Sequence, residues 1–221
     1  MQHKYFIETY GCQMNVYDSE LVSEMMSKSG YSKAETIHDA DAIFLNTCAI
    51  REKAEINVLN RLDNIKPLKK SKPHLLIGVL GCMAKNMKDI LLEEKPFVDV
   101  ILGPDSYRRI PEIIKSRASI DYNSIVDTKL SKFEIYDGLS PSRKDGVNAW
   151  ISISRGCDKF CTFCIVPFTR GRERHRSILS IVEEAIDCIE KGFVEITLLG
   201  QNVNSYKTPD GNFPELLAAI A

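Results

Sequence analysis

The sequence lacks any run of 18 or more apolar residues, so no segment of it is long enough to be a transmembrane helix. It also has almost no net charge, because 29 Lys and Arg stand against 30 Asp and Glu, and no overall field draws it toward nucleic acid or membranes. Residues 1–10 lack the apolar stretch of a secretion signal, since Glu8 interrupts them. The expected compartment is therefore the reducing cytoplasm, where the seven cysteines favour metal binding or catalysis over disulfides.

The 221 residues suffice for one large domain or two small ones, and 44% of them are hydrophobic, enough to bury a core. Short apolar runs alternate with stretches of helical spacing through the first hundred residues. The runs lie at 5–10, 42–46, 75–80 and 98–102, and the helical stretches at 20–26, 54–65 and 87–92. Strands that alternate with helices of this length predict βαβ units, a parallel sheet and an α/β fold.

Residues 118–146 change character, because Ser, Asp, Asn and Lys dominate them. We therefore expect a first domain over residues 1–118, a linker region over 119–146 and a second domain over 147–221. The second domain should contain a strand at 149–154, a cysteine-rich loop, a helix at 178–191 and a strand at 193–199. A last helix begins near residue 214 and reaches Ala221 without a capping signal, which predicts that this second βα series is incomplete.

Three cysteines, Cys157, Cys161 and Cys164, lie within one short loop. Thiolates are soft ligands suited to iron–sulfur clusters, and this tight spacing lets one loop wrap one cluster. Three ligands leave one iron of a four-iron cluster open to a substrate or cofactor, as in catalytic zinc sites. Two alternatives remain: the three positions could mark the buried face of a helix, or they could bind zinc with His175 as the fourth ligand.

Cys12, Cys48 and Cys82 are far apart in the sequence, but each follows a predicted strand. In a parallel sheet the carboxyl ends of the strands share one edge, where open α/β folds bind ligands. We therefore expect these thiols to converge, and Gly11 and Gly81 let the backbone turn tightly beside a bulky ligand. The alternative is that each is a small buried hydrophobic residue.

Other polar and sulfur-bearing positions are less informative. Cys188 shares the apolar side of the predicted helix at 178–191, so we expect it to pack in the core. Gln201 and Asn202 follow a predicted strand, where they could either meet a cofactor or form a turn.

Between residues 143 and 176 there are eight Lys and Arg and only three acidic residues. The basic positions are 143, 144, 155, 159, 170, 172, 174 and 176. A basic segment beside the cysteine loop predicts contacts with nucleic-acid phosphates near the active site, and the alternative is a solvated charged loop.

Several stretches together resemble one known family. They are residues 10–15 (YGCQMN), 45–54 (LNTCAIREKA), 81–82 (GC), 155–177 (RGCDKFCTFCIVPFTRGRERHRS) and 198–206 (LLGQNVNSY). With them the chain resembles the MiaB family of radical-SAM methylthiotransferases, which install a methylthio group on adenosine 37 of tRNA. The resemblance covers nearly the whole chain. It implies an N-terminal parallel-sheet methylthiotransferase domain followed by the first βα units of a radical-SAM partial TIM barrel, without the rest of the barrel or the small RNA-binding domain that ends family members.

The resemblance also implies two four-iron, four-sulfur (4Fe-4S) clusters and S-adenosyl-L-methionine as cofactors. Cys157, Cys161 and Cys164 would hold the cluster whose open iron binds S-adenosylmethionine. Cys12, Cys48 and Cys82 would hold a second cluster connected with sulfur delivery. The implied reaction adds a methylthio group to C2 of N6-isopentenyladenosine: a 5′-deoxyadenosyl radical takes the hydrogen, the second cluster delivers sulfur, and a second S-adenosylmethionine gives the methyl group. No catalytic acid or base is assigned, and the arginines of the basic segment could also bind the carboxylate of S-adenosylmethionine.

The implied partners are tRNA, through an adenosine of the anticodon loop, and an electron donor and a sulfur source of unknown identity. No membrane partner is expected, and we expect this chain to be inactive by itself. The closest alternatives are methylthiotransferases for threonylcarbamoyl-adenosine tRNA or for a ribosomal-protein aspartate. A more distant alternative is a non-enzymatic iron–sulfur or zinc protein.

Overall fold

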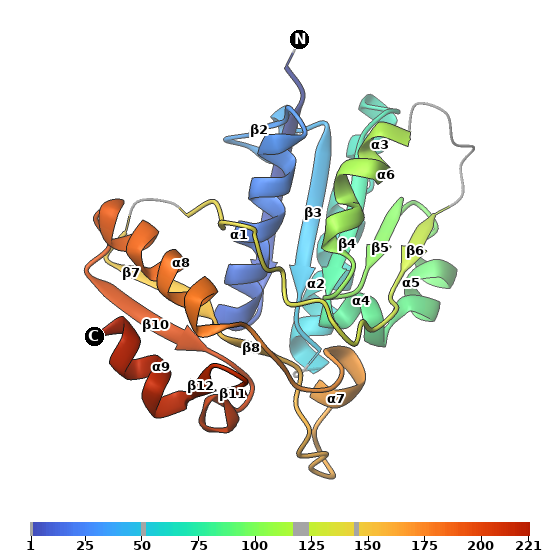
Figure 1. The fold of residues 1–221 in the computed structure, drawn as a ribbon. Helices are drawn as coiled ribbons and strands as arrows, with labels where there is room; N and C mark the ends of the chain where they lie inside the picture. Colours follow the sequence, from blue (N-terminus) through green and yellow to red (C-terminus); the bar gives the residue numbers. More distant parts are fainter. Residues whose placement is uncertain (1, 50–51, 117–123, 144–145) are drawn as a thin grey trace.

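The computed structural model describes residues 2–49, 52–116, 124–143 and 146–221. The first part is a parallel sheet with strand order β2-β1-β3-β4-β5-β6 (Figure 1). Its strands are β1 (Lys4–Tyr10), β2 (Ser32–Lys33), β3 (Ala42–Thr47), β4 (Leu76–Gly81), β5 (Val100–Leu102) and β6 (Ile125–Asp127). The predicted parallel sheet and its four main strands are confirmed. The sequence missed β2, which contains no apolar residue, and β6, whose two apolar residues stand in a polar stretch.

Helices cover both faces of this sheet (Figure 1). One face carries α1 (Gln13–Lys28), the turn η2 (Tyr107–Arg109) and α6 (Ile110–Ser116). The other carries α2 (Glu52–Ile65), α3 (Leu68–Ser71), α4 (Cys82–Asn86) and α5 (Lys88–Glu94), with the turn η1 (Ile37–Asp39) at the margin. The alternation along β3 divides the core, since Phe44 packs in the first cluster and its neighbours Ile43 and Leu45 in the second.

Helix α1 begins earlier than the predicted stretch at 20–26: its first residue is Gln13, directly after Cys12. Its first turns bury polar residues, among them Asn15, Asp18 and Ser19, and these break the apolar periodicity from which a helix is predicted. The same polar side chains contact the sheet edge and the second part of the chain, so the irregularity coincides with the site described below.

The second part contains two parallel strands, β7 (Asn148–Ser152) and β10 (Glu195–Leu199). Helices α8 (Ile178–Glu190) and α9 (Phe213–Ile220) pack with these strands around a separate small core. Cys188 is fully buried there, which confirms its predicted packing role. The remaining elements are short: β8 (Ser154–Arg155), α7 (Val166–Thr169), β9 (Arg174–His175), η4 (Val203–Ser205), β11 (Lys207–Thr208) and β12 (Gly211–Asn212).

The region expected to be a linker, residues 119–146, contributes to the first part of the fold. Strand β6 extends the sheet, and Tyr136 is fully buried in the core beneath α1 and α6. The Tyr136 hydroxyl donates to the carbonyl oxygen of Pro104 at 2.8 Å and accepts the backbone N–H of Tyr107 at 3.0 Å. Residues 119–123 and 144–145 of this region lie outside the described residues, and the domain boundary stays a prediction.

The two parts are in direct contact, because α1 lies between the large sheet and strand β7 (Figure 1). Leu199, at the end of β10, also packs against the core of the first part. Over the described ranges, no helix is both long enough and apolar enough to cross a membrane.

Candidate functional site

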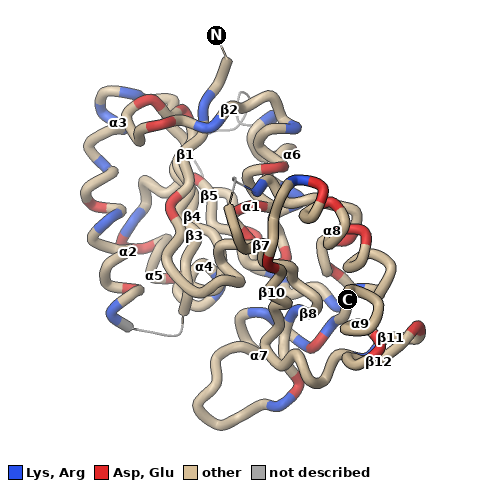
Figure 2. The backbone as a smooth tube through the Cα atoms, turned by 90° about the vertical axis from the view of Figure 1, so that its left-hand side faces the viewer, with Lys and Arg blue, Asp and Glu red and all other residues tan. Residues whose placement is uncertain are grey.

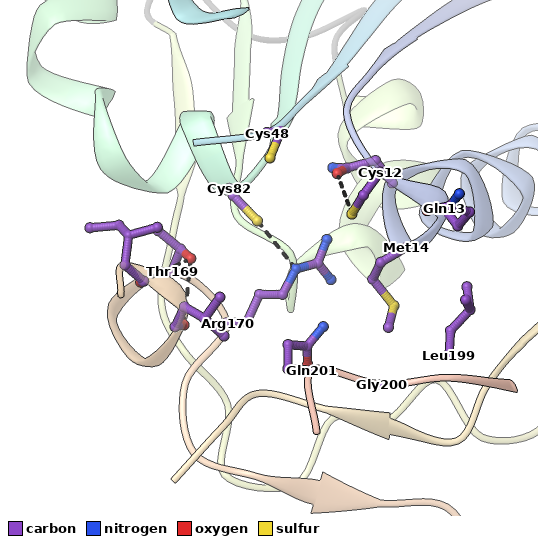
Figure 3. A pocket seen from close by; sticks show the side chains of 13 residues that line it. Cys12, Gln13, Met14, Cys48, Cys82, Thr169, Arg170, Leu199, Gly200 and Gln201 are labelled. Atoms are coloured by element: carbon purple, nitrogen blue, oxygen red, sulfur yellow. Dashed lines mark hydrogen bonds between the residues drawn. The ribbon is translucent and has the colours of Figure 1, made fainter. Parts of the chain in front are cut away.

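The three dispersed cysteines lie at the carboxyl ends of three neighbouring strands. Cys12 caps the start of α1 just beyond β1, Cys48 directly follows β3, and Cys82 is the first residue of α4 after β4. Strand order reverses between β1 and β3, and in open α/β sheets ligands bind outside the strand ends at such a point. All three cysteines line one cavity of about 330 Å³ (Figure 3). The predicted convergence is confirmed, and the role of these thiols as cluster ligands stays a prediction.

Two glycines allow the backbone to turn at this edge. Gly81 has φ = +93°, and a Cβ atom there would lie 2.5 Å from the carbonyl oxygen of Thr47. At Gly11 a Cβ atom would lie 2.3 Å from the side-chain oxygen of Asn15 and 3.0 Å from the Cβ of Cys48. A larger residue at Gly81 would therefore displace the backbone that leads to Cys48, and one at Gly11 would displace the buried side chain of Asn15.

A buried amide network fixes the start of α1 against the end of β3. Asn15 donates to the Asn46 side-chain oxygen at 3.2 Å and to the Thr47 carbonyl at 3.3 Å. Asn46 donates in return to the Asn15 carbonyl and the Ser19 hydroxyl, both at 2.9 Å. The Cys12 thiol lies 3.5 Å from the Asn15 oxygen, so this network also orients a cavity-lining cysteine. This role was not predicted from the sequence, although Asn15 follows Cys12 by three residues and Asn46 precedes Cys48 by two.

The opposite wall of the cavity comes from the second part of the chain. It is formed by Ile165, Val166, Thr169, Arg170, Leu199, Gly200 and Gln201. Figure 3 shows the cysteine sulfurs on one side, Gly200 and Gln201 on the other, and the Arg170 guanidinium between Cys82 and Met14. The side-chain oxygen of Gln201 is buried and has no partner among the described residues, whereas the Asn202 carbonyl accepts the N–H of Ser205 in turn η4. Gln201 therefore faces the cavity and Asn202 forms the turn.

Arg170 connects this cavity to a buried ion-pair network. Its Nε–H donates to the Cys82 sulfur at 3.2 Å, and its Nη2 donates to Asp18 at 2.8 Å. Arg155 donates to the other oxygen of Asp18, also at 2.8 Å. Burial alone would raise the pKa of Asp18, but the charges of the two arginines outweigh it and hold that pKa below its ordinary value.

The basic segment is mostly interior, which corrects the prediction of a phosphate-binding surface and equally its alternative, a solvated loop. Five of its arginines have side chains at most 6% exposed, and each pairs with a buried carboxylate: Arg143, Arg155, Arg170, Arg174 and Arg176. The exposed Arg172 is held by Asp158 at 2.6 Å. Figure 2 shows basic and acidic residues interleaved around β8 and α7. Lys144 lies outside the described residues.

The local cysteines lie in the loop between β8 and α7, apart from the cavity. Cys157 is buried, Cys161 is exposed and Cys164 is intermediate. Gly156 has φ = +78°, and a Cβ atom there would lie 2.1 Å from the carbonyl oxygen of Arg172, so only glycine fits at the start of the loop. Cys157 then donates its backbone N–H to Gly171, and Cys164 donates to Cys161, which closes a turn.

Within the described ranges, no three Cys, His, Asp or Glu side chains lie close enough to share one metal ion. The zinc alternative needs such a group, and His175 instead packs edge-on against Tyr206 at 5.4 Å. In a four-iron cluster each thiolate binds a different iron, so its ligands are farther apart than those of one ion. The role of Cys157, Cys161 and Cys164 as cluster ligands stays a prediction.

Comparisons with known proteins agree with this two-part arrangement. The profile of the Uncharacterized protein family UPF0004 matches residues 4–103, and that of the Radical SAM superfamily matches residues 151–220. The fold resembles the radical S-adenosylmethionine methyltransferase TsrM from Kitasatospora setae, solved with tryptophan substrate and a SAM analog. The TM-score is 0.61 with 12% identity, over 92% of this chain and 48% of that one.

Curated relatives match the chain far more closely in sequence. A tRNA-2-methylthio-N(6)-dimethylallyladenosine synthase of Bacteroides fragilis is 51% identical, over 99% of this chain and 49% of that protein. The protein of the same name from Bacteroides thetaiotaomicron is 50% identical, with the same coverage. The chain thus spans about half the length of these relatives. Its sequence identity and its two matched profiles show that the chain belongs to the MiaB family of radical-SAM methylthiotransferases.

Proposed function

We propose that this protein is a radical-SAM tRNA methylthiotransferase, which adds a methylthio group to C2 of N6-isopentenyladenosine at position 37 of tRNA. One observation carries the proposal. Thiols from the ends of three strands of the first part line a single cavity with Arg170 and Gln201 of the radical-SAM part. A cavity shared in this way lets a sulfur source on one side meet a radical-generating cofactor on the other.

Cys12, Cys48 and Cys82 are the proposed ligands of one 4Fe-4S cluster. The donor set fits, because it offers three soft ligands at the wall of a cavity whose volume of about 330 Å³ lies in the usual range for ligand sites. Arg170 places a cationic N–H donor 3.2 Å from the Cys82 sulfur, where it would meet the negative charge of a bound cluster. The buried amide network keeps Cys12 oriented when nothing is bound.

Cys157, Cys161 and Cys164 are the proposed ligands of a second cluster, which binds S-adenosylmethionine. When bound, the two clusters supply the electron that cleaves S-adenosylmethionine and the sulfur that enters the product. The protein itself would position the substrate and cofactors and shield them from water. Apolar side chains line part of the cavity and would exclude water from the bound adenine base; they are Met14, Ile165, Val166 and Leu199. Gln201 offers a buried side-chain oxygen to an N–H of the substrate or cofactor.

The proposed partner is tRNA, in the cytoplasm, together with an electron donor and a sulfur source. The relatives are named as dimethylallyladenosine synthases, which supports that branch over threonylcarbamoyl-adenosine tRNA or a ribosomal-protein aspartate. The buried arginines of residues 143–176 leave the phosphate contacts to other surfaces.

The test is a set of cysteine variants made in a full-length protein that contains this chain, reconstituted with iron and sulfide under anaerobic conditions. Cys157→Ala is expected to abolish 5′-deoxyadenosine formation. Cys48→Ala should keep that cleavage, lose about half of the bound iron and give no methylthiolated nucleoside. Cys188→Ala is the control, because its thiol is buried in the small core away from both sets. Product at the parent rate from Cys48→Ala would contradict the proposal.

A second assay decides the substrate. The full-length protein is incubated in parallel with tRNA carrying isopentenyladenosine, tRNA carrying threonylcarbamoyl-adenosine, and the ribosomal protein, and products are identified by mass spectrometry. Product is expected only from the first, and equal turnover of either alternative would refute this branch.

A further inference from the structure

The side chain of Arg170 points into the cavity although it belongs to the second part of the chain (Figure 3). It is only 3% exposed, and two of its three nitrogens are occupied, Nε by Cys82 and Nη2 by Asp18. The third nitrogen, Nη1, is buried and has no hydrogen-bond partner among the described residues. A buried donor without a partner destabilises the folded state by about 1–3 kcal/mol, and by more when it is charged. An acceptor bound in the cavity would remove this penalty.

The orientation of this guanidinium is fixed from both ends. The Arg170 backbone N–H bonds the Val166 carbonyl at 2.8 Å, and the Arg170 carbonyl accepts from Arg174 at 2.7 Å. Asp18 is itself clamped by Arg155. Arg170 therefore cannot swing its free N–H toward bulk water, and the acceptor has to come to the cavity.

The charge around this point identifies the acceptor as an anion. Three guanidinium groups, those of Arg155, Arg170 and Arg174, share two carboxylates, Asp18 and Asp105. One positive charge is thus left over beside the cysteine sulfurs, in an environment where water screens little.

We propose that Arg170 is a positioning residue for the cluster of the dispersed cysteines: its Nε–H holds the Cys82 thiolate, and its Nη1–H donates to an inorganic sulfide of that cluster. This inference rests on the proposed function only for the presence of the cluster. Hydrogen bonds and positive charge at cluster sulfurs stabilise the more negative, reduced state, so Arg170 raises the reduction potential of this cluster. The radical-SAM part thereby sets the redox behaviour of a cluster whose ligands all lie in the first part.

The experiment isolates that cluster in a parent protein in which Cys157, Cys161 and Cys164 are all replaced by Ala. Arg170→Gln, Arg170→Lys and the control Arg176→Lys are then made in this parent. Arg176 is equally buried, at 3% exposed, and also pairs with a carboxylate, but it does not line the cavity. After reconstitution, iron and acid-labile sulfide are counted, and the midpoint potential is measured by electron paramagnetic resonance during titration with dithionite.

Arg170→Gln is expected to lower the midpoint potential, because it removes the charge and the donor geometry. Arg170→Lys keeps the charge but cannot reach Cys82, Asp18 and the sulfide together, so a smaller shift in the same direction is expected. Arg176→Lys should leave the potential unchanged. Circular dichroism selects folded samples, and if Arg170→Gln does not fold, the Arg170→Lys comparison decides.

Two results would overturn the inference, and they are distinguishable. A folded, fully iron-loaded Arg170 variant with the parent potential means that Arg170 does not touch the cluster, and leaves the proposed function intact. If the parent protein binds no iron although Arg170 is present, the dispersed cysteines hold no cluster, and both this inference and the proposed function are wrong.

Discussion

Replacing Asp18 by Asn is the most severe test of how the two parts of the chain are joined. The Asp18 side chain is fully buried and accepts from Arg155 and Arg170, each at 2.8 Å. Asparagine keeps the shape but removes the charge, so two guanidinium groups remain buried with one carboxylate fewer. Removing one partner of a buried ion pair costs about 3–5 kcal/mol, a large share of a typical unfolding free energy of about 5–15 kcal/mol.

Asp158→Asn is the matched control. Asp158 also accepts two hydrogen bonds from an arginine, but its side chain is 39% exposed and that of its partner Arg172 is 70% exposed. Water screens such a pair, so its loss should cost less than about 1 kcal/mol. The two variants differ mainly in burial, and the difference between them measures what burial contributes.

The assay is urea unfolding followed by circular dichroism at several pH values. The folded-state pKa of Asp18 lies below its ordinary value, so its contribution is present above about pH 4 and is lost as the pH falls through the folded pKa. Parent and Asp18→Asn curves should therefore differ most near pH 7 and converge in acid. A loss at pH 7 no larger than that of Asp158→Asn would refute the reasoning.

Three further outcomes are expected. Burial raises the pKa of Glu20 to about 7, so the folded protein binds this proton more tightly than the unfolded chain. The unfolding free energy of the parent should therefore fall by about 3 kcal/mol between pH 4.5 and 7. Urea titration of Glu20→Gln should show no such fall. Gly156→Ala should cost at least about 3 kcal/mol, while Gly138→Ala, with a similar φ of +72° but nothing within 4 Å, should cost about 1 kcal/mol, both measured by thermal unfolding. Cys188→Ser should lower the thermal midpoint without changing the iron content, and a loss of iron would contradict its core role.

Much of the fold could be predicted from local pattern. The strands β3 and β4 are buried on both faces, so each reads as a continuous apolar run, and helices separate them along the chain. A parallel sheet then brings its carboxyl ends to one edge, and this is why Cys48 and Cys82 could be expected to meet Cys12. That inference needs only the position of each cysteine relative to its own strand.

The opposite wall of the cavity could not be predicted in the same way. A run of arginines has the pattern of a phosphate-binding or solvated segment when its partners are unknown. Asp18 neutralises Arg155 and Arg170, which lie 137 and 152 residues further along the chain. It belongs to the first turns of α1, where buried polar residues mask the helical pattern. Nothing local in the sequence indicates that pairing.

The sequence alone was enough to predict the four main strands of the large sheet, most of the longer helices and the two cysteine sets, because apolar periodicity and ligand spacing are properties of neighbouring residues. Three features could be seen only in the folded chain: α1 packs between the large sheet and β7, Asp18 pairs with Arg170 in the interior, and Arg170 donates to Cys82. The physical reason is burial: a charge is stable inside a protein only when its partner is in place, and that partner is supplied by the fold.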